Sequence, residues 1–163
     1  MPDASHSKSL DEIWFEAQHV VRNRVRHSIR EHVPGSVGGG GFHLLSHVIQ
    51  AGPVSPSELA ARLDIRSSTI ANHLDRLEEA GWIVREAVSG TSTRVQVRAT
   101  APGEEAYRRY LELRRTVLEG FLEPLGDDER ALFSRLLERA LEHADRWPPR
   151  RRAGRARTVR EAR

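Results

Sequence analysis

The sequence predicts a mainly α-helical fold with a small β-hairpin and therefore only minor β content. Apolar residues recur at intervals of three and four over most of the 163 residues, as expected for amphipathic helices. Residue patterns that cap helices precede several of these stretches. The pattern changes to an alternation of apolar and polar residues in only one place, around residues 83–99.

A long amphipathic helix is expected over residues 9–32. Ser9 can cap its first turn while Glu12, three residues later, reaches back to the Ser9 backbone. Its apolar residues follow a helical period: Leu10, Ile13, Trp14, Ala17, Val20, Val21, Val25 and Ile29. The four glycines 38–41 should interrupt regular structure, because glycine loses the most backbone freedom on folding. We interpret them as a hinge before the second helix.

Three shorter helices are expected next. The second helix should run from residue 42 to Gly52, and the third starts with Ser55 as its cap and Pro56 in its first turn. The fourth should have its cap near Ser67 and be closed by Gly81. Its apolar stripe consists of Ile70, Leu74 and Leu77, and its opposite face carries Ser68, Thr69, Asn72, His73 and Arg76. A merely solvated face usually carries Glu and Lys pairs, so this face calls for another explanation.

The remaining elements are a hairpin and two helices. Val95, Val97 and Ala99 alternate with polar residues, and Ser89-Gly90 lies between two such runs, which indicates an antiparallel hairpin. Thr100 should cap a long helix over 101–125, and Asp127 a last helix over 127–146. Residues 1–8 and 148–163 are expected to form flexible tails.

Composition limits the possible functions. The absence of cysteine excludes disulfides, thiolate metal sites and cysteine redox sensing. No apolar run is long enough for a membrane span and the N-terminus lacks a signal-peptide core, so a cytoplasmic protein is expected. The net charge of +3 is uneven, because the tail from residue 150 onward carries seven arginines and one glutamate. That tail either binds DNA phosphates without sequence preference or is a passive extension.

The order helix, turn, helix, hairpin is that of a winged helix-turn-helix, here residues 42–100. Such a module places its second helix in the major groove of DNA, where short polar side chains, threonine methyls, Asn and Arg can read base edges. The polar face of the fourth helix fits this task. The candidate DNA contacts are Ser55, Ser57, Arg66, Ser67, Ser68, Thr69, Asn72, His73, Arg76, Thr93 and Arg94.

Two stretches carry a family resemblance. SPSELAARLDIRSSTIANHLDRLEEAGWIVRE, residues 55–86, resembles the DNA-binding core of the MarR family of bacterial regulators. RATAPGEEAYRRY, residues 98–110, is similar to the Leu-Thr-x-x-Gly stretch that begins the long fifth helix of that family, and a looser resemblance covers residues 9–146. The resemblance implies a single domain that forms a homodimer through helices 9–32 and 101–146. It also implies a repressor of transcription that binds palindromic double-stranded operators and is released by a small-molecule effector.

The wing departs from the family pattern. The family usually carries Asp-x-Arg there, with the arginine in the minor groove. Counting back from Ala99-Thr100 places Thr91 and Thr93 at those positions. Arg94 is one residue away and faces the other side of the strand unless a bulge corrects the register.

The resemblance also implies an effector pocket between the second helix and the dimerisation helices. Its candidate lining residues are Trp14, Gln18, His43, His47, Tyr107 and Tyr110. For each of them, ordinary packing is the alternative.

Other functions remain open at this stage. His43 and His47 have a spacing that can bind a metal, and a third histidine such as His19 would complete a zinc-responsive regulator. A winged-helix module for protein interaction or non-specific DNA binding is a further hypothesis. An enzyme is not expected, because the sequence lacks a nucleophile motif, a phosphate-binding lysine loop and a paired-carboxylate site. The leading hypothesis requires no metal and no cofactor.

Overall fold

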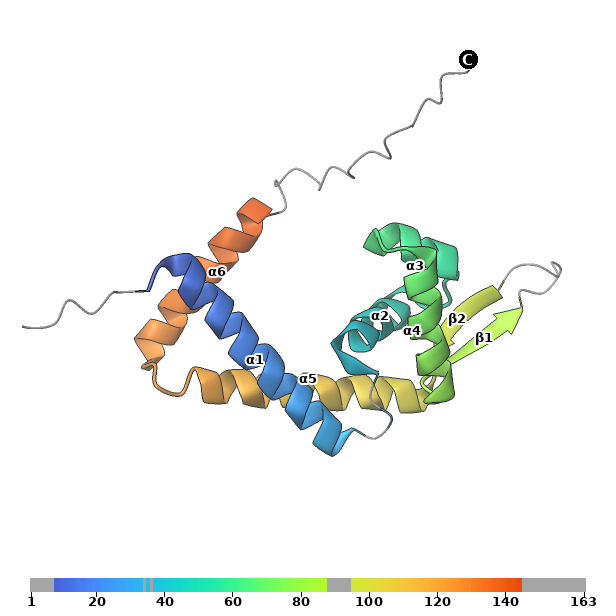
Figure 1. The fold of residues 1–163 in the computed structure, drawn as a ribbon, viewed down its shortest axis with the longest axis horizontal. Coiled ribbons are helices and arrows are strands. Elements are labelled where there is room, and N and C mark those ends of the chain that lie inside the picture. Colours follow the sequence, from blue (N-terminus) through green and yellow to red (C-terminus); the bar gives the residue numbers. More distant parts are fainter. Residues whose placement is uncertain (1–7, 34, 36, 88–94, 145–163) are drawn as a thin grey trace, which may run out of the picture. The chain divides into compact units, whose positions relative to one another are not determined.

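The computed structural model describes residues 8–33, 35, 37–87 and 95–144. It contains six helices and one hairpin within these residues (Figure 1): α1 (Leu10–His32), α2 (Gly38–Ala51), α3 (Pro56–Leu63), α4 (Ser67–Glu79), β1 (Ile83–Ala87), β2 (Val95–Ala99), α5 (Ala101–Phe121) and α6 (Asp127–Ala144). The chain divides into two compact units after Phe121. The predicted fold class, mainly α with one small hairpin, is confirmed. None of the helices in the described ranges is both long enough and apolar enough to cross a membrane.

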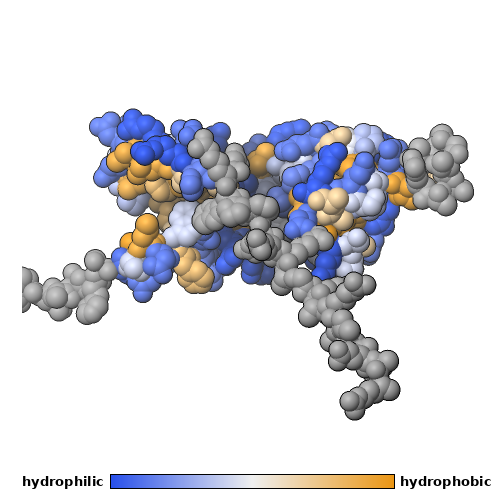
Figure 2. All heavy atoms as spheres, turned by 90° about the horizontal axis from the view of Figure 1, so that it is seen from above, coloured by the Kyte–Doolittle hydropathy of each residue, from blue (hydrophilic) through white to orange (hydrophobic). Residues whose placement is uncertain are grey.

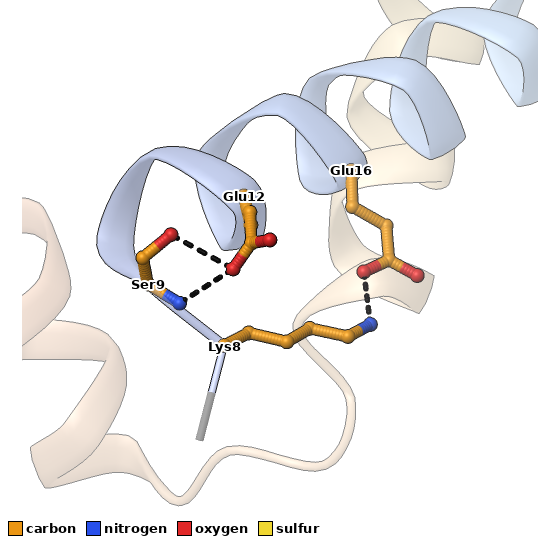
Figure 3. Close-up of polar contacts among 4 residues, drawn as sticks. All are labelled: Lys8, Ser9, Glu12 and Glu16. Atoms are coloured by element: carbon orange, nitrogen blue, oxygen red, sulfur yellow. Dashed lines mark hydrogen bonds and ion pairs between the residues drawn. The ribbon is translucent and has the colours of Figure 1, made fainter. Parts of the chain in front are cut away.

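The first turn of α1 is held by the predicted capping box (Figure 3). The Glu12 carboxylate accepts hydrogen bonds from the Ser9 backbone N–H and from the Ser9 hydroxyl, each at 2.8 Å. These two bonds lower the pKa of Glu12. Lys8 forms an ion pair with Glu16 one turn further along. The start of α1 is therefore fixed by local contacts that the sequence pattern already indicates.

The core of the first unit lies among α2, α3, α4 and the hairpin, and it includes the end of α1 and the start of α5. Phe42 is fully buried and stacks on Tyr110 of α5 with ring centroids 4.3 Å apart. Its ring also meets Trp82 at 5.3 Å. The remaining large, fully buried side chains are Leu44, Leu45, Val48, Leu59, Ile70, Leu74, Leu77, Ile83 and Val97.

The hairpin pairs Ile83 with Ala99 and Ala87 with Val95 in antiparallel register. Val97 is buried while Arg98 is exposed, as the predicted alternation requires. Val54, just before α3, exchanges two backbone hydrogen bonds with Val97 at 3.1 and 2.8 Å. This bridge attaches the helix-turn-helix to the hairpin.

The prediction for the glycine run was wrong. The glycines 38–41 are not a hinge but the first turn of α2, which begins four residues earlier than expected. Close packing explains two of them: a Cβ on Gly41 would lie 2.2 Å from the Val37 side chain, and one on Gly40 would lie 3.1 Å from the His73 ring of α4. Tertiary contact therefore overrides the low helix propensity of glycine.

Gly103, in the first turn of α5, is required by a similar close approach. A Cβ at this position would lie 2.1 Å from the carbonyl oxygen of Trp82. The Thr100 hydroxyl donates to the Gly81 carbonyl oxygen at 2.7 Å and accepts from the Gly103 N–H at 3.2 Å. Thr100 and Gly103 thus fasten α5 to the end of α4, which explains the Thr-x-x-Gly pattern.

Two helix ends differ from the prediction. Helix α5 ends at Phe121 rather than at residue 125, because Pro124 removes a backbone donor and disfavours helical geometry in the residue before it. Asp127 is the first residue of α6 and not its cap. Gly126 precedes it, and its N–H donates to the Glu129 carboxylate at 2.8 Å.

Large apolar side chains remain exposed on α1, α5 and α6. Helix α6 contains no buried residue, and Leu136 and Leu141 are 52% and 67% exposed. On α1 the exposed apolar residues are Leu10, Ile13, Trp14, Phe15 and Val20. Figure 2 shows such apolar groups at the surface among charged ones.

Candidate nucleic-acid interface

Helix α4 presents the two faces that the sequence predicts. Its stripe of Ile70, Leu74 and Leu77 is buried against α2, α3 and β1. On the other side Ser68, Thr69 and Asn72 are exposed, and so is Arg76. A rigid, buried stripe therefore holds a row of short hydrogen-bonding side chains outward, which is the arrangement that reading base edges requires.

The N-cap position of α4 differs from the prediction. Arg66 occupies the N-cap position in extended geometry, and Ser67 is the first helical residue. Among the described residues no side chain caps this end. Its first N–H groups can therefore donate to a phosphate oxygen, a role that helix N-termini often play. Arg66, Ser67 and Ser68 are all exposed around this end.

Helix α3 carries two further predicted contacts, Ser55 and Ser57. The Ser55 hydroxyl is already engaged as the cap of α3, because it accepts from the Glu58 N–H at 3.2 Å. It also lies 3.1 Å from the Ser57 hydroxyl. Ser57 is exposed and is the more available of the two for a phosphate contact.

His73 is placed differently from the other candidates on α4. Its ring is half-buried and packs against Gly40 at the start of α2. Its Nδ1 atom is buried without a hydrogen-bond partner among the described residues. The side chain thus faces α2 rather than the solvent, so its predicted DNA contact gains no support from the geometry.

Arg76 lies at the edge of the polar face, toward α1. It lines cavities together with Arg30 of α1 and Val37, which precedes α2. Its guanidinium can therefore act on the DNA-facing side of α4 or in these cavities.

Arg85, on β1, is a residue that sequence reasoning missed. It donates to Asp75 at 2.6 Å and to Glu78 at 2.8 Å, both on α4. These bonds neutralise two carboxylates on α4 and tie the first wing strand to that helix. The spacing of Asp75 and Glu78, one helical turn apart, was the available signal, but their strand partner could not be chosen from sequence.

Three predicted wing positions fall in the stretch between β1 and β2. Thr93 and Arg94, together with the family position at Thr91, lie outside the described residues. At the base of the wing Arg98 pairs with Glu86 across the strands at 2.7 Å.

The candidate effector-pocket residues are only partly brought together. Tyr107 and Tyr110 pack against the core, with ring centroids 6.0 Å apart. One face of Tyr110 is covered by Phe42, so this ring takes part in ordinary packing. Trp14 and Gln18 on α1 are exposed. The pocket remains a prediction.

His43 and His47 lie side by side on α2, with ring centroids 4.8 Å apart. Desolvation lowers the pKa of His47, and the charges of His43 and Arg62 lower it further. His19, the suggested third ligand, lies 2.8 Å from the Asn23 amide instead. Within the described ranges, no three metal-binding side chains are grouped as a metal site requires.

Comparison with known proteins identifies the family to which the winged helix-turn-helix is related. Residues 40–89 match the sequence model of the MarR family. Over 90 residues the chain is 32% identical to the HTH-type transcriptional regulator PecS of Dickeya dadantii (strain 3937), a match that covers 55% of this chain and 54% of PecS. A putative transcriptional regulatory protein for the hcr operon of Thauera aromatica is 30% identical over 109 residues, or 66% of each chain. The chain belongs to the MarR family.

Solved structures show the same fold. A crystal structure of MarR, 24% identical, has a TM-score of 0.70 and covers 85% of this chain and 99% of its own. The structure of Streptococcus pneumoniae FabT in complex with DNA, 17% identical, also has a TM-score of 0.70, covering 85% and 97%. The likeness in fold thus covers more of the chain than residues 40–89, which match the family model. The PecS match spans about half of the length of that relative.

Proposed function

We propose that this MarR-family chain is a sequence-specific, DNA-binding transcriptional regulator. The observation that carries the proposal is the exposed row of Ser68, Thr69 and Asn72 on a helix whose opposite face is locked into the core. The uncapped N-terminus of α4 supports it, because it offers N–H groups to the DNA backbone. The relatives named as transcriptional regulators, and FabT in complex with DNA, support it further.

The regulator is proposed to act as a homodimer. The apolar side chains left exposed on α1 and α6, such as Trp14 and Leu136, support this proposal because monomeric proteins rarely expose such stripes. Two copies related by a two-fold axis would present two α4 helices. These helices must lie roughly 34 Å apart to enter successive major grooves of a palindrome.

Repression and ligand release complete the proposal. A dimer bound over a promoter would compete with transcription. Repression is supported by the likeness to the HTH-type transcriptional repressor YetL of Bacillus subtilis (strain 168), which is 22% identical over 72% of this chain. An effector lowers DNA affinity only if it binds the non-docking arrangement of the two α4 helices more tightly.

Fluorescence anisotropy on selected DNA tests the proposal. A binding site is first selected from a random-sequence duplex library with the full chain, and its affinity is compared with that of a shuffled duplex. Asn72→Ala should reduce this discrimination by about 1–3 kcal/mol, because a base contact is lost. Asn23→Ala, an exposed asparagine on α1, is the matched control and should leave it unchanged. Failure to enrich any sequence, or equal discrimination by wild type and Asn72→Ala, would refute the assignment of α4.

A further inference from the structure

Arg85 lies on the inward face of the hairpin, in the middle of β1. It stands directly opposite Val97 of β2 in the antiparallel register, and paired residues project from the same face of a sheet. Val97 and Ile83, two residues before Arg85, are both buried on that face. The Arg85 side chain is 29% exposed, whereas that of Arg98 on the same hairpin is 51% exposed. Arg85 therefore belongs to the side of the hairpin that packs against the rest of the unit.

The guanidinium of Arg85 joins β1 to α4, the helix that lies beside it (Figure 1). Its Nη2 donates to Asp75 at 2.6 Å and its Nη1 donates to Glu78 at 2.8 Å. The two carboxylates are three residues apart and therefore lie on one face of α4. Because a guanidinium is planar and its donors have fixed directions, two simultaneous partners determine the angle between strand and helix as well as their distance. We call these two contacts the Arg85 ion pairs.

Beyond the Arg85 ion pairs the hairpin leaves the rest of the unit. Glu86 and Ala87, the next two residues of β1, are exposed, and so is Val95 at the start of β2. A two-stranded hairpin is barely stable by itself, so the direction of its outer part depends on its last contacts with the body of the protein. The Arg85 ion pairs supply such a contact at the point where burial along β1 ends.

We propose that Arg85 is a positioning residue for DNA binding, which sets the angle of the wing relative to α4 through its ion pairs with Asp75 and Glu78. This role rests on the proposed function and goes beyond it, because Arg85 itself contacts no DNA atom in this arrangement. With the angle fixed, one duplex can be contacted by both elements at the same time. Helix α4 lies in the major groove, and the wing lies at the adjacent backbone or minor groove.

A wing of fixed direction raises affinity because it lowers the entropic cost of binding. A hairpin that moves freely must be ordered when the complex forms, and that ordering subtracts from the free energy of association. The Arg85 ion pairs order the hairpin beforehand. The charge of Arg85 is the competing explanation, because it neutralises two carboxylates on the helix that approaches the DNA phosphates. A variant without the ion pairs but with unchanged net charge separates the two explanations.

Amide hydrogen exchange of the full chain tests the position of the wing without DNA. Val97 directs its backbone N–H and carbonyl to Val54, so Glu86 and Gln96 form the hydrogen-bonded pair just beyond Arg85. In Arg85→Gln the amides of Glu86 and Gln96 should exchange about tenfold faster than in wild type, because the outer hairpin opens without its contact to α4. Equal exchange in the two proteins would overturn the proposal.

Arg109→Gln is the matched control for this experiment. Arg109 also pairs with a carboxylate, at 3.1 Å, but its partner Glu105 lies on the same helix, α5. Its replacement removes the same charge as Arg85→Gln and should leave the exchange of the hairpin amides as in wild type. The amide of Leu74 in α4 should keep its slow exchange in both variants, since Leu74 is fully buried. Faster exchange at Leu74 in Arg85→Gln would show a loss of the whole fold and would contradict a role confined to the wing.

Affinity for the selected duplex tests the effect on DNA binding. Arg85→Gln should weaken it by about tenfold, the effect of losing one charge-assisted contact between the wing and DNA. The double variant Arg85→Gln/Glu78→Gln has the net charge of wild type but lacks the ion pairs, and it should bind as weakly as Arg85→Gln. Recovery of wild-type affinity in the double variant would show that Arg85 acts through its charge, which would overturn the proposal.

Footprinting at saturating protein locates the contact that is lost. Dimethyl sulfate methylates guanine N7 in the major groove and reports on α4, whereas hydroxyl radicals attack sugars along the minor groove and report on the wing. Arg85→Gln should keep the protected guanines of each half-site and lose the protection of the flanking sugars. Loss of both kinds of protection would assign Arg85 to the whole module rather than to the wing. If wild type selects no duplex at all, the proposed function fails, but hydrogen exchange still decides whether Arg85 holds the wing against α4.

Discussion

The winged module buries its apolar residues within the chain, whereas α1 and α6 leave most of theirs exposed. In the module, Leu45, Leu59 and Leu74 are fully buried by α2, α3, α4 and the hairpin of the same chain. In α6 no residue is buried, and on α1 burial reaches its full extent only near Ile29. Both regions have the same periodic pattern in the sequence. The pattern therefore shows which side of a helix is apolar, but not whether the same chain covers it.

This contrast makes different predictions for similar leucines. A leucine of the module contributes to the stability of the single chain, whatever the protein concentration. In the proposed homodimer a leucine of α6 contributes to association instead, so the effect of replacing it should depend on protein concentration.

The largest effect on folding is expected for Leu74→Ala in α4. Leu74 is fully buried, so its truncation should lower the free energy of unfolding by about 2–5 kcal/mol through lost burial and a residual cavity. Urea denaturation followed by circular dichroism measures it. Leu141→Ala, at a leucine that is 67% exposed on α6, should cost less than about 1 kcal/mol in dilute protein. An equal decrease in the free energy of unfolding for the two variants would show that the two regions do not differ in this respect.

Association should be sensitive to Leu136→Glu in α6. If this stripe forms the interface of a homodimer, the substitution places a carboxylate in it twice, and the dissociation constant should rise by about a hundredfold or more. Sedimentation equilibrium measures the change. Ala131→Glu, an exposed position on the other side of α6, serves as the control and should leave association intact. A wild-type chain that remains monomeric at all concentrations would contradict the homodimer.

Replacement of the two capping serines tests the same difference between the winged module and α1. Ser55→Ala should cost about 1 kcal/mol of global stability, because α3 carries the fully buried Leu59 and folds with the core. Ser9→Ala removes the capping box of α1, where the following turn is exposed, and should only fray that end. Thermal unfolding and amide hydrogen exchange distinguish these outcomes. A similar loss of global stability in Ser9→Ala would show that α1 unfolds together with the core.

The smallest effect is expected for the pH dependence at His47. Burial lowers its folded-state pKa below the ordinary value of 6.5, so the folded chain binds a proton less readily than the unfolded chain. Stability is therefore present above pH 6.5 and is lost as the pH falls below it. His47→Gln should flatten this part of the stability curve. Gln50→Ala, at an exposed and non-titrating position of the same helix, is the control and should leave the slope as it is in wild type.

Local patterns in the sequence determined most of the elements. The capping boxes at Ser9 and Ser55, the stripe of Ile70, Leu74 and Leu77, and the alternation around Val97 all involve residues within a few positions of one another. Such short-range preferences act the same way in any chain, so helices, hairpin and the polar face of α4 could be predicted. The order helix, turn, helix, hairpin then favoured a DNA-binding role for that face.

Only the tertiary structure decided the features that join distant segments. It placed glycines 38–41 inside α2, where the side chains of His73 and Val37 occupy the space that a Cβ on Gly40 or Gly41 would fill. It joined Arg85 to Asp75 and Glu78, and it brought Arg26, Arg30 and Arg76 around one cavity. These contacts depend on how helices pack across the core, and periodicity along a single helix carries no information about its neighbours.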